Sequence, residues 1–426
     1  MRPGSRLRTG LLAVVVLAAA LTLGVVQPTI IAPGGEPTEP RTADDVRLVA
    51  LEDHPARLWA YTSRQQSFDT ATLPINVVVK EDAATTRRVV EAGTGEEWHT
   101  DHEDGEAVRL GGSGLAWRET VGAARYTYVR TGDGGEWMAE TTQVHDGTYL
   151  GARSHIRFYE FSAEGERWTA LQAHHEHWDW FRLRHTVGSV ARGQYTVEHE
   201  FYGTGLVGDI SRERFGNGGA LDADGWVTVV DLVEWRPPRP GAETGGGTAD
   251  LVAAGLTLTL LSVGGRFAGA REAVAAAARQ TDTTRDHALL VGTLLVTPLA
   301  VRVGAIALER ALPAVSPKVV AAPGYLVLAV GLPLAAGTLG RRLAADEAFT
   351  AAVVGLGAGL LVDYAYLGID TLRVGVVGHR LALLLGIGLV AAGGVRWAER
   401  PLHRHGYHLL GALVWVGALV WPLAGL

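Results

Sequence analysis

Seven long apolar runs constrain this 426-residue chain more than any other feature of its sequence. The runs lie at residues 9–31, 249–265, 287–308, 319–340, 348–369, 374–395 and 407–426. About 20 helical residues, rising ~1.5 Å each, cross the ~30 Å hydrocarbon core of a bilayer. The sequence therefore predicts a multi-pass membrane protein whose main partner is the lipid bilayer.

Charge separates the region between the first two runs from the rest of the chain. Residues 32–247 hold 35 acidic and 21 basic residues, a net charge of −14, whereas the remaining residues carry a net charge of +7. The chain has no cysteine, which excludes disulfide scaffolds, thiol catalysis and cysteine-based metal clusters. The two regions are thus expected to face different solvents.

We expect three segments. Residues 1–35 form an N-terminal transmembrane anchor or signal-like segment, residues 36–245 an exported acidic α+β domain, and residues 246–426 an all-α bundle of six transmembrane helices. Proline and glycine cluster near both ends of the acidic domain, which favours linkers there. An uncleaved anchor fits better than a signal peptide, because the first apolar run continues to Ile31, although a cleavage site near Ala32 stays open.

The arginines predict the orientation, because short cytoplasmic loops retain positive charge. The arginines that flank the expected spans on one side are Arg2, Arg6, Arg8, Arg266, Arg271, Arg279, Arg285, Arg341, Arg342, Arg396, Arg400 and Arg404. This side is expected to be cytoplasmic together with the N-terminus. Residues 36–245 and the C-terminus are then extracytoplasmic, and Trp415 and Trp421 suit an aromatic belt at the outer interface.

Alternating apolar and aromatic residues predict strands in the exported domain, with a helix over residues 81–92. The expected strands cover residues 75–80, 125–130, 154–161, 167–180 and 226–235. The acidic surface with a single lysine, Lys80, is typical of a halophilic and archaeal protein, and an ordinary acidic surface is the alternative. Nucleic acid is excluded as a partner, since phosphate binding requires a basic face.

A histidine-rich run in the fourth expected strand is the strongest candidate for a metal site. Alternation along a strand places His175, His177 and Asp179 on one face, and His155 in the neighbouring strand is a further ligand candidate. Imidazole and carboxylate ligands favour a divalent metal such as zinc, manganese or iron. The alternative is that these histidines are polar or hydrogen-bonded strand residues among aromatic side chains.

The exported domain also resembles a family. Residues 73–79, the following helix, residues 154–159 and the stretch from Trp168 to the histidine-rich run resemble the LssY carboxyl-terminal type of domain. The resemblance implies equivalent positions at Asn76, His155, Arg157, His174 and His175, with an acidic position near Glu198 or Glu200. Members often accompany membrane phosphatase domains, but residues 248–426 lack the phosphatase motifs, and His177 to Trp180 depart from the family pattern.

Charged residues inside the expected spans define a second candidate site. Arg302, Asp363 and Arg380 each lie six residues from the outer end of their span, at a depth of about 9 Å, with Tyr364 and His379 nearby. Intramembrane charges usually face the interior of a bundle, so these residues are expected to form a cluster. Two interpretations fit this cluster. It is either an ion pair that fixes helix packing or a site for an ion, a proton or a ligand.

The sequence favours a multi-pass membrane protein whose extracytoplasmic domain binds a small ligand or an envelope protein. One alternative is a metal-dependent hydrolase of envelope lipid or glycan at the outer surface, which uses the histidine-rich run. The other is a small-solute transporter, whose transport site would lie at the membrane depth of Arg302 and Asp363.

Overall fold

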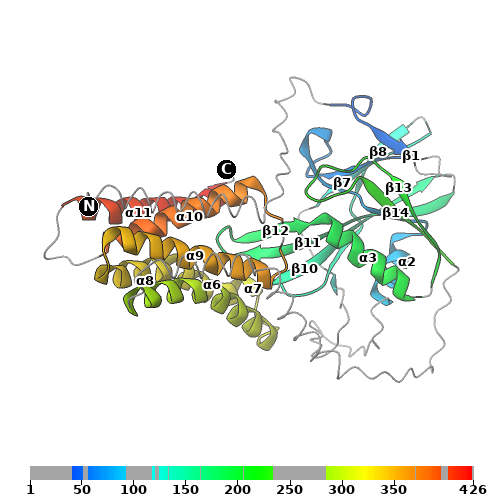
Figure 1. Cartoon of the computed structure of the whole chain (residues 1–426). Coiled ribbons are helices and arrows are strands. Elements are labelled where there is room, and N and C mark those ends of the chain that lie inside the picture. Colours follow the sequence, from blue (N-terminus) through cyan, green and yellow to red (C-terminus); the bar gives the residue numbers. More distant parts are fainter. Residues whose placement is uncertain are drawn as a thin grey trace.

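The computed structural model describes residues 41–50, 56–92, 118–119, 124–132, 134–163, 165–204, 206–233, 285–369, 371–394 and 402–424. A β-rich domain precedes residue 234, and apolar helices follow residue 284 (Figure 1). The apolar runs expected at 9–31 and 249–265, and the expected domain boundaries, lie outside these residues.

The smaller sheet follows the order β1-β2-β7-β3-β4, and β8 pairs with β7. Its strands are β1 (Leu48–Ala50), β2 (Arg57–Trp59), β3 (Tyr61–Ser63), β4 (Ala71–Pro74), β7 (Tyr126–Thr131) and β8 (Gly134–Ala139). A 3-10 turn, η1 (Phe68–Thr70), connects β3 to β4. The ring of Trp59 packs edge-on against Phe68 and Trp137, with centroids 5.0 and 5.7 Å away. Aromatic packing therefore stabilises this sheet of short strands.

The larger sheet follows the order β13-β14-β5-β11-β10-β9-β6, and β12 pairs with β11. Its strands are β5 (Val77–Val79), β6 (Arg118–Glu119), β9 (Thr142–His145), β10 (Ala152–Ala163), β11 (Glu166–Asp179), β12 (Arg184–Ser189), β13 (Val207–Arg214) and β14 (Trp226–Leu232). Among the described strands of this sheet, all pairings are antiparallel except that between β14 and β5. The long hairpin of β10 and β11 is the centre of this sheet.

Two helices, α2 (Ala83–Ala92) and α3 (Val190–Thr204), cover one face of the larger sheet (Figure 1). Its other face packs on the smaller sheet through buried residues such as Tyr159 and Trp168. Helix α3 approaches β11 so closely that a Cβ atom at Gly193 would lie 2.3 Å from the Cα atom of His174. Only glycine allows this approach.

The expected α+β domain is confirmed as a β-rich domain with two sheets, and every expected strand overlaps an observed one. The sequence interpretation missed α3. Its weak helical propensity, with Gly193 near the start, concealed a helix that begins where the Ser189 Oγ atom accepts the backbone N–H of Arg192. The carboxylate of Asp222 also accepts the N–H groups of Val190 and Ala191.

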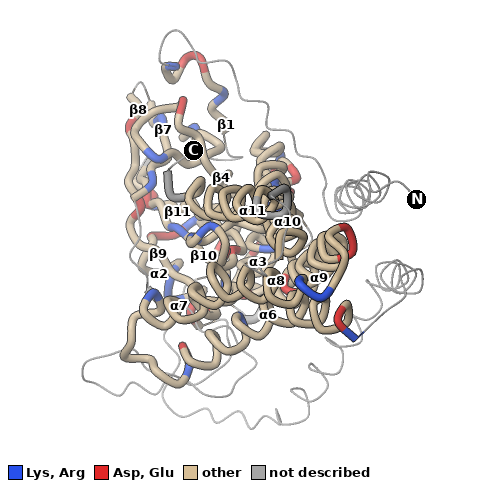
Figure 2. The backbone as a smooth tube through the Cα atoms, turned by 90° about the vertical axis from the view of Figure 1, so that its left-hand side faces the viewer, with Lys and Arg blue, Asp and Glu red and all other residues tan. Residues whose placement is uncertain are grey.

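Four helical segments in the described part of the chain are long and apolar enough to cross a membrane. The helical elements are α6 (Arg285–Ala311), α7 (Pro317–Leu326), η2 (Val327–Gly331), α8 (Leu332–Leu339), η3 (Gly340–Arg342), α9 (Ala345–Tyr366), α10 (Val374–Gly393), α11 (Leu402–Val420) and η4 (Trp421–Ala424). One span combines α7 to η3, and α11 is a shorter apolar helix. The six expected spans and the anchor are therefore not confirmed as a set. Figure 2 shows these helices almost free of charged residues except near their ends.

A π-helical turn interrupts the second of these spans. Pro333 has no N–H to donate to the carbonyl of Ala329 four residues earlier, and the N–H of Leu332 reaches back five residues to Val327. The indole Nε1 of Trp415 donates to the Ala329 carbonyl at 2.8 Å. Trp415 is 2% exposed, so its expected place in an outer aromatic belt is wrong, whereas Trp421 is exposed.

The β-rich domain and the helices share one hydrophobic core. Leu150, Trp178, Trp180 and Phe181 of the domain belong to the same buried cluster as the apolar residues of α6 to α11. A Cβ atom at Gly324 would lie 3.2 Å from the ring of Trp180, which shows how closely the two parts pack. The domain therefore sits directly on one end of the bundle.

Candidate functional site

The register of the β10–β11 hairpin builds a polar strip on one face of the larger sheet. Ala163 pairs with Glu166, and this register places His155 opposite His174 and Arg153 opposite Glu176. Paired residues of antiparallel strands point to the same face. His155, His174 and Glu176 therefore converge, although they come from two strands.

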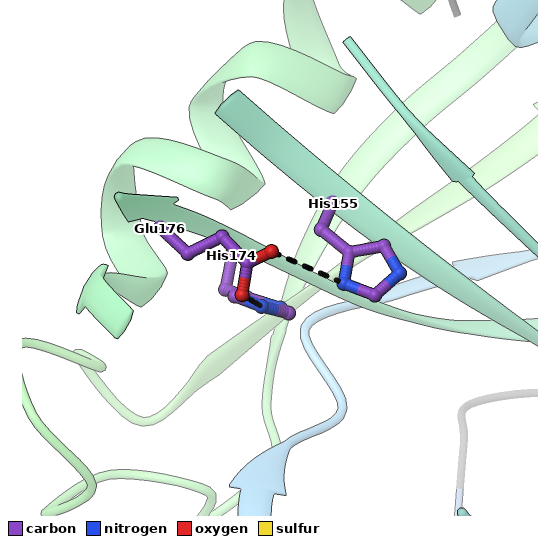
Figure 3. Close-up of side chains that lie close together, drawn as sticks. All are labelled: His155, His174 and Glu176. Atoms are coloured by element: carbon purple, nitrogen blue, oxygen red, sulfur yellow. Dashed lines mark hydrogen bonds and ion pairs between the residues drawn. The ribbon is translucent and has the colours of Figure 1, made fainter. Parts of the chain in front are cut away.

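These three side chains form a group that can hold a metal ion. The side chains of His155, His174 and Glu176 point toward one another (Figure 3). One ligand atom from each lies within 4.8 Å of the other two. The His174 Nε2 atom is 3.2 Å from the Glu176 Oε2 atom, and the His155 Nδ1 atom is 3.9 Å from Oε1. Bonds of ~2.1 Å to a tetrahedral ion separate neighbouring ligand atoms by about 3.4 Å, so small side-chain shifts suffice to bind one.

The ring nitrogens of His155 and His174 that face away from the triad's centre have partners of their own, and Glu176 also contacts Arg153. The His155 Nε2 atom lies 3.1 Å from Oε1 of Gln143, and the His174 Nδ1 atom lies 3.0 Å from the Gln172 amide. The Arg153 Nη2 atom lies 2.6 Å from Oε1 of Glu176. Such outer partners fix ring orientation and tautomer, as they do around metal-binding histidines.

Electrostatics in this site favour a neutral His155 beside an ionised Glu176. Burial, followed by the charge of His174, lowers the pKa of His155 well below its usual range. Burial opposes ionisation of Glu176, but its hydrogen bond to His174 and the charges of His174 and Arg153 hold its pKa well below its usual range. A neutral imidazole and a carboxylate are the forms that ligate metals.

The predicted ligand set requires a correction. His155 lies on the opposite face of the hairpin from His177 and Asp179, because it pairs with His174. The Oδ1 atom of Asp179 accepts the guanidinium of Arg380, and the ring of His177 lies 6.4 Å from that of Tyr364, so both belong to the contact with the helices. His175 pairs with Ser189 of β12, where the register shifts.

Arg302 joins the helices to the domain at the second candidate site. Its guanidinium forms an ion pair with Asp363 through Nε and Oδ1, and Nη2 lies 2.8 Å from Oδ2. The same guanidinium donates to the carbonyl oxygens of Leu150 at 2.9 Å and Trp178 at 3.1 Å. Arg302 is 1% exposed, so this ion pair lies in the buried contact between the two parts.

Arg380 forms the second half of this contact. It donates to Asp179 Oδ1 at 2.5 Å, to the Tyr364 hydroxyl at 2.7 Å, and lies 2.7 Å from Nδ1 of His379. The structure thus brings Arg302 and Asp363 together, and places Arg380 with Tyr364 and His379. The acidic partner of Arg380 is Asp179 of β11, a contact that the interpretation as a purely intramembrane cluster missed.

Two further contacts cross the same boundary. The carboxylate of Glu309 accepts the backbone N–H groups of Tyr149 at 2.7 Å and Leu150 at 2.9 Å. The Arg192 Nη1 atom donates to the carbonyl of Gly368 at 3.1 Å. Together with the bonds of Arg302 and Arg380, these contacts suit a fixed arrangement rather than a loose tether.

The sequence contained a signal for the convergence of His174 and Glu176 with His155, which the sequence interpretation missed. In the short connection between Ala163 and Glu166, Gly165 has φ of 90°, a value that suits glycine in a tight turn. This turn sets the register that pairs His155 with His174. Analysis of the turn would therefore have placed His155 on the same strand face as His174.

The positions that the family resemblance implies have separate roles. The Asn76 side chain bridges to β11, donating to the Ala173 carbonyl at 2.8 Å and accepting its N–H at 2.9 Å. Arg157 forms an ion pair with Glu140 on the polar strip. Glu198 of α3 pairs with the partly exposed Arg212 of β13 at 2.7 Å. His155 and His174 are the two of these positions that meet in the triad.

No protein-family model matches this chain, and comparisons with curated proteins and with solved structures find no match.

Proposed function

We propose that this protein is a membrane-anchored, extracytoplasmic binding protein whose β-rich domain takes up a divalent cation. The observation that carries the proposal is the convergence of ligand atoms from His155, His174 and Glu176 within 4.8 Å. The helical bundle holds this domain at the membrane surface through the Arg302 and Arg380 contacts. The resemblance to the LssY carboxyl-terminal type of domain stays a prediction, and the proposal does not depend on it.

Two imidazoles and one carboxylate are a ligand set that zinc, manganese and iron accept. The three side chains are 3–6% exposed, so an ion here is screened from bulk water. A catalytic ion needs a coordination position that is open to substrate. The burial of the triad therefore favours a structural or sensing ion over the metal-dependent hydrolase.

The arrangement of the helices supports the extracytoplasmic location. The C-terminal ends of α6 and α9 and the N-terminal end of α10 contact the β-rich domain, as the bonds of Glu309, Arg192 and Arg380 show. The Ala418 carbonyl, near the end of α11, accepts from His379 on the same side. Arg341 and Arg342 end the second span at the other side, which the distribution of positive charge assigns to the cytoplasm.

Metal content of the full-length protein, purified in detergent and exposed to zinc or manganese, tests the proposal. We expect about one ion per chain, lost in a variant that combines His155→Ala and His174→Ala. His175→Ala is the matched control, because it removes an imidazole from the other strand face and is expected to retain the ion.

Each alternative gives a different result. A wild-type protein that binds neither metal after this exposure would sink the proposal. Loss of the ion in His175→Ala and His177→Ala, but not in the His155 and His174 variant, would favour the other face of β11. Circular dichroism of every variant separates loss of a ligand from loss of the fold.

A further inference from the structure

A cavity of about 530 Å³ lies between the turn that connects β11 to β12 and the first turns of α7. Tyr149, Trp178 and Arg184 line it from the domain, and Lys318 and Tyr325 line it from the helix. The cavity is distinct from the His155, His174 and Glu176 triad, whose residues do not line it. It belongs to the junction between the two parts of the molecule.

The cavity lies where a lipid headgroup is expected. Lys318 is the second residue of the span Pro317–Arg342, and the exposed apolar side chains of Val319, Leu326 and Val330 follow it along the same span. Apolar side chains that stay exposed on a membrane helix face acyl chains. The lysine at the start of such a helix therefore marks the level of the headgroups.

The charge of the cavity is positive. Arg184 and Lys318 are exposed lining residues, the lining contains no carboxylate, and neither cation has an ion pair among the described residues. Burial and the neighbouring charge of Arg184 lower the pKa of Arg182 in the same turn. The charge of Arg184 also acts on Arg373, which precedes α10. An anion is the ligand that relieves this repulsion between cations.

No carboxylate among the described residues forms an ion pair with Arg184 or Lys318. The two oxygens of Glu309, near Tyr149, accept backbone N–H groups rather than either cation. His185 also lines the cavity, and its Nε2 atom lies 2.9 Å from the Tyr149 carbonyl. The domain as a whole is acidic, so two unpaired cations at the place where it meets the bundle require a separate reason.

The walls of the cavity suit the remainder of a lipid headgroup. Tyr149 and Trp178 stack 5.3 Å apart on the domain side, and Tyr325 faces them from α7 as a lining residue. Aromatic side chains with one polar end are favoured at the boundary between headgroups and acyl chains. The alanines at positions 321 and 322 leave the helix side open.

We propose that this cavity binds the headgroup phosphate of an anionic phospholipid in the outer leaflet. Arg184 and Lys318 neutralise the phosphate, the aromatic walls contact the glycerol region, and the acyl chains lie along the exposed face of α7 and α8. The lipid would then bridge the domain and the bundle. The binding of a free phosphate ion shares the charge contacts but not the contact with the helix face.

Native mass spectrometry of the full-length protein, released from nanodiscs of phosphatidylcholine with phosphatidylglycerol, tests the proposal. We expect phosphatidylglycerol to be retained selectively, with about 25-fold weaker binding in a variant that combines Arg184→Gln and Lys318→Gln, since each cation near the surface adds about a factor of five. The charge-matched control combines Arg57→Gln and Arg214→Gln, which remove two exposed arginines outside the cavity and should leave retention unchanged.

A second variant keeps the charges and fills the space. Ala322→Trp narrows the cavity from its helix side and is expected to reduce phosphatidylglycerol retention while the protein stays folded, because Ala322 is exposed. Equal retention of phosphatidylcholine and phosphatidylglycerol by the wild type would overturn the proposal. So would displacement of the lipid by millimolar inorganic phosphate, or unchanged retention in both cavity variants.

Discussion

The guanidinium of Arg380 in α10 donates to the carboxylate of Asp179 at the end of β11, at 2.5 Å and across 201 positions of the chain. The side chain of Arg380 is 8% exposed and that of Asp179 is fully buried. A charged pair removed from water in this way depends on both members, because either one alone remains buried and uncompensated. The effect of substitutions in this pair on stability therefore tests whether the domain packs against the bundle as described.

Removal of one partner is expected to destabilise the protein strongly. Asp179→Asn should lower the free energy of unfolding by about 3–5 kcal/mol, because Arg380 would remain charged and buried. Combining Asp179→Asn with Arg380→Gln should cost less than the sum of the two single changes. Reversible unfolding in mixed micelles measures these values.

The control for these single and double substitutions is an exposed ion pair that is also formed by an arginine and an aspartate. Arg41 and Asp69 are 2.8 Å apart and partly exposed, so Arg41→Gln should cost less than about 1 kcal/mol. Strict additivity of the Asp179 and Arg380 changes would show that the two side chains do not interact.

Swapping the charges of Arg302 and Asp363 should restore only part of the protein that is lost when Asp363 alone is changed. Asp363→Arg alone should abolish accumulation of the protein in the membrane, because two cations would then meet in a buried site. Adding Arg302→Asp restores opposite charges but not the hydrogen bonds from Arg302 to the Leu150 and Trp178 carbonyls. We therefore expect partial rescue, measured as membrane-inserted protein, and complete rescue would show that these two hydrogen bonds contribute little.

Much of the fold follows from local patterns in the sequence. The apolar runs at 287–308, 319–340, 348–369 and 374–395 correspond to the four spans, because bilayer thickness fixes both length and composition. The strands that were expected are rich in β-branched and aromatic residues, and several of them are buried on both faces. The short strands of the smaller sheet carry too few residues for such a pattern to emerge.

The sites depend on pairings that local patterns do not contain. Alternation correctly separated His175 and His177 from His174, but only the register between β10 and β11 assigns His155 to a face. The grouping of Arg302 with Asp363 could be predicted because the span ends set their depth. Asp179 could not be matched to Arg380, since that contact depends on how a whole domain sits on the helices.

Trp415 is expected to stabilise the bundle through the carbonyl that Pro333 leaves without its usual donor. Trp415→Phe removes the bond from Nε1 to the Ala329 oxygen and leaves a buried acceptor unpaired, at a cost of about 1–3 kcal/mol. Trp421→Phe is the matched control, because Trp421 is 54% exposed and should change stability little. Equal effects of the two substitutions on thermal unfolding in detergent would contradict a specific role for this hydrogen bond.

Glu200 on α3 should make the folded protein less stable as the pH rises. Burial, and next the charge of Asp146, raise its pKa from 4.5 to about 7. The folded state therefore holds this proton more tightly than the unfolded state. The loss of stability that comes from ionising Glu200 in the folded protein is absent below pH 4.5 and complete above about pH 7. Glu200→Gln should stabilise the protein by about 1–2 kcal/mol at pH 8, after allowance for solvent screening, and have no effect at pH 4. Unfolding curves at the two pH values check this, and a gain of equal size at both would show that the carboxyl does not titrate in this range.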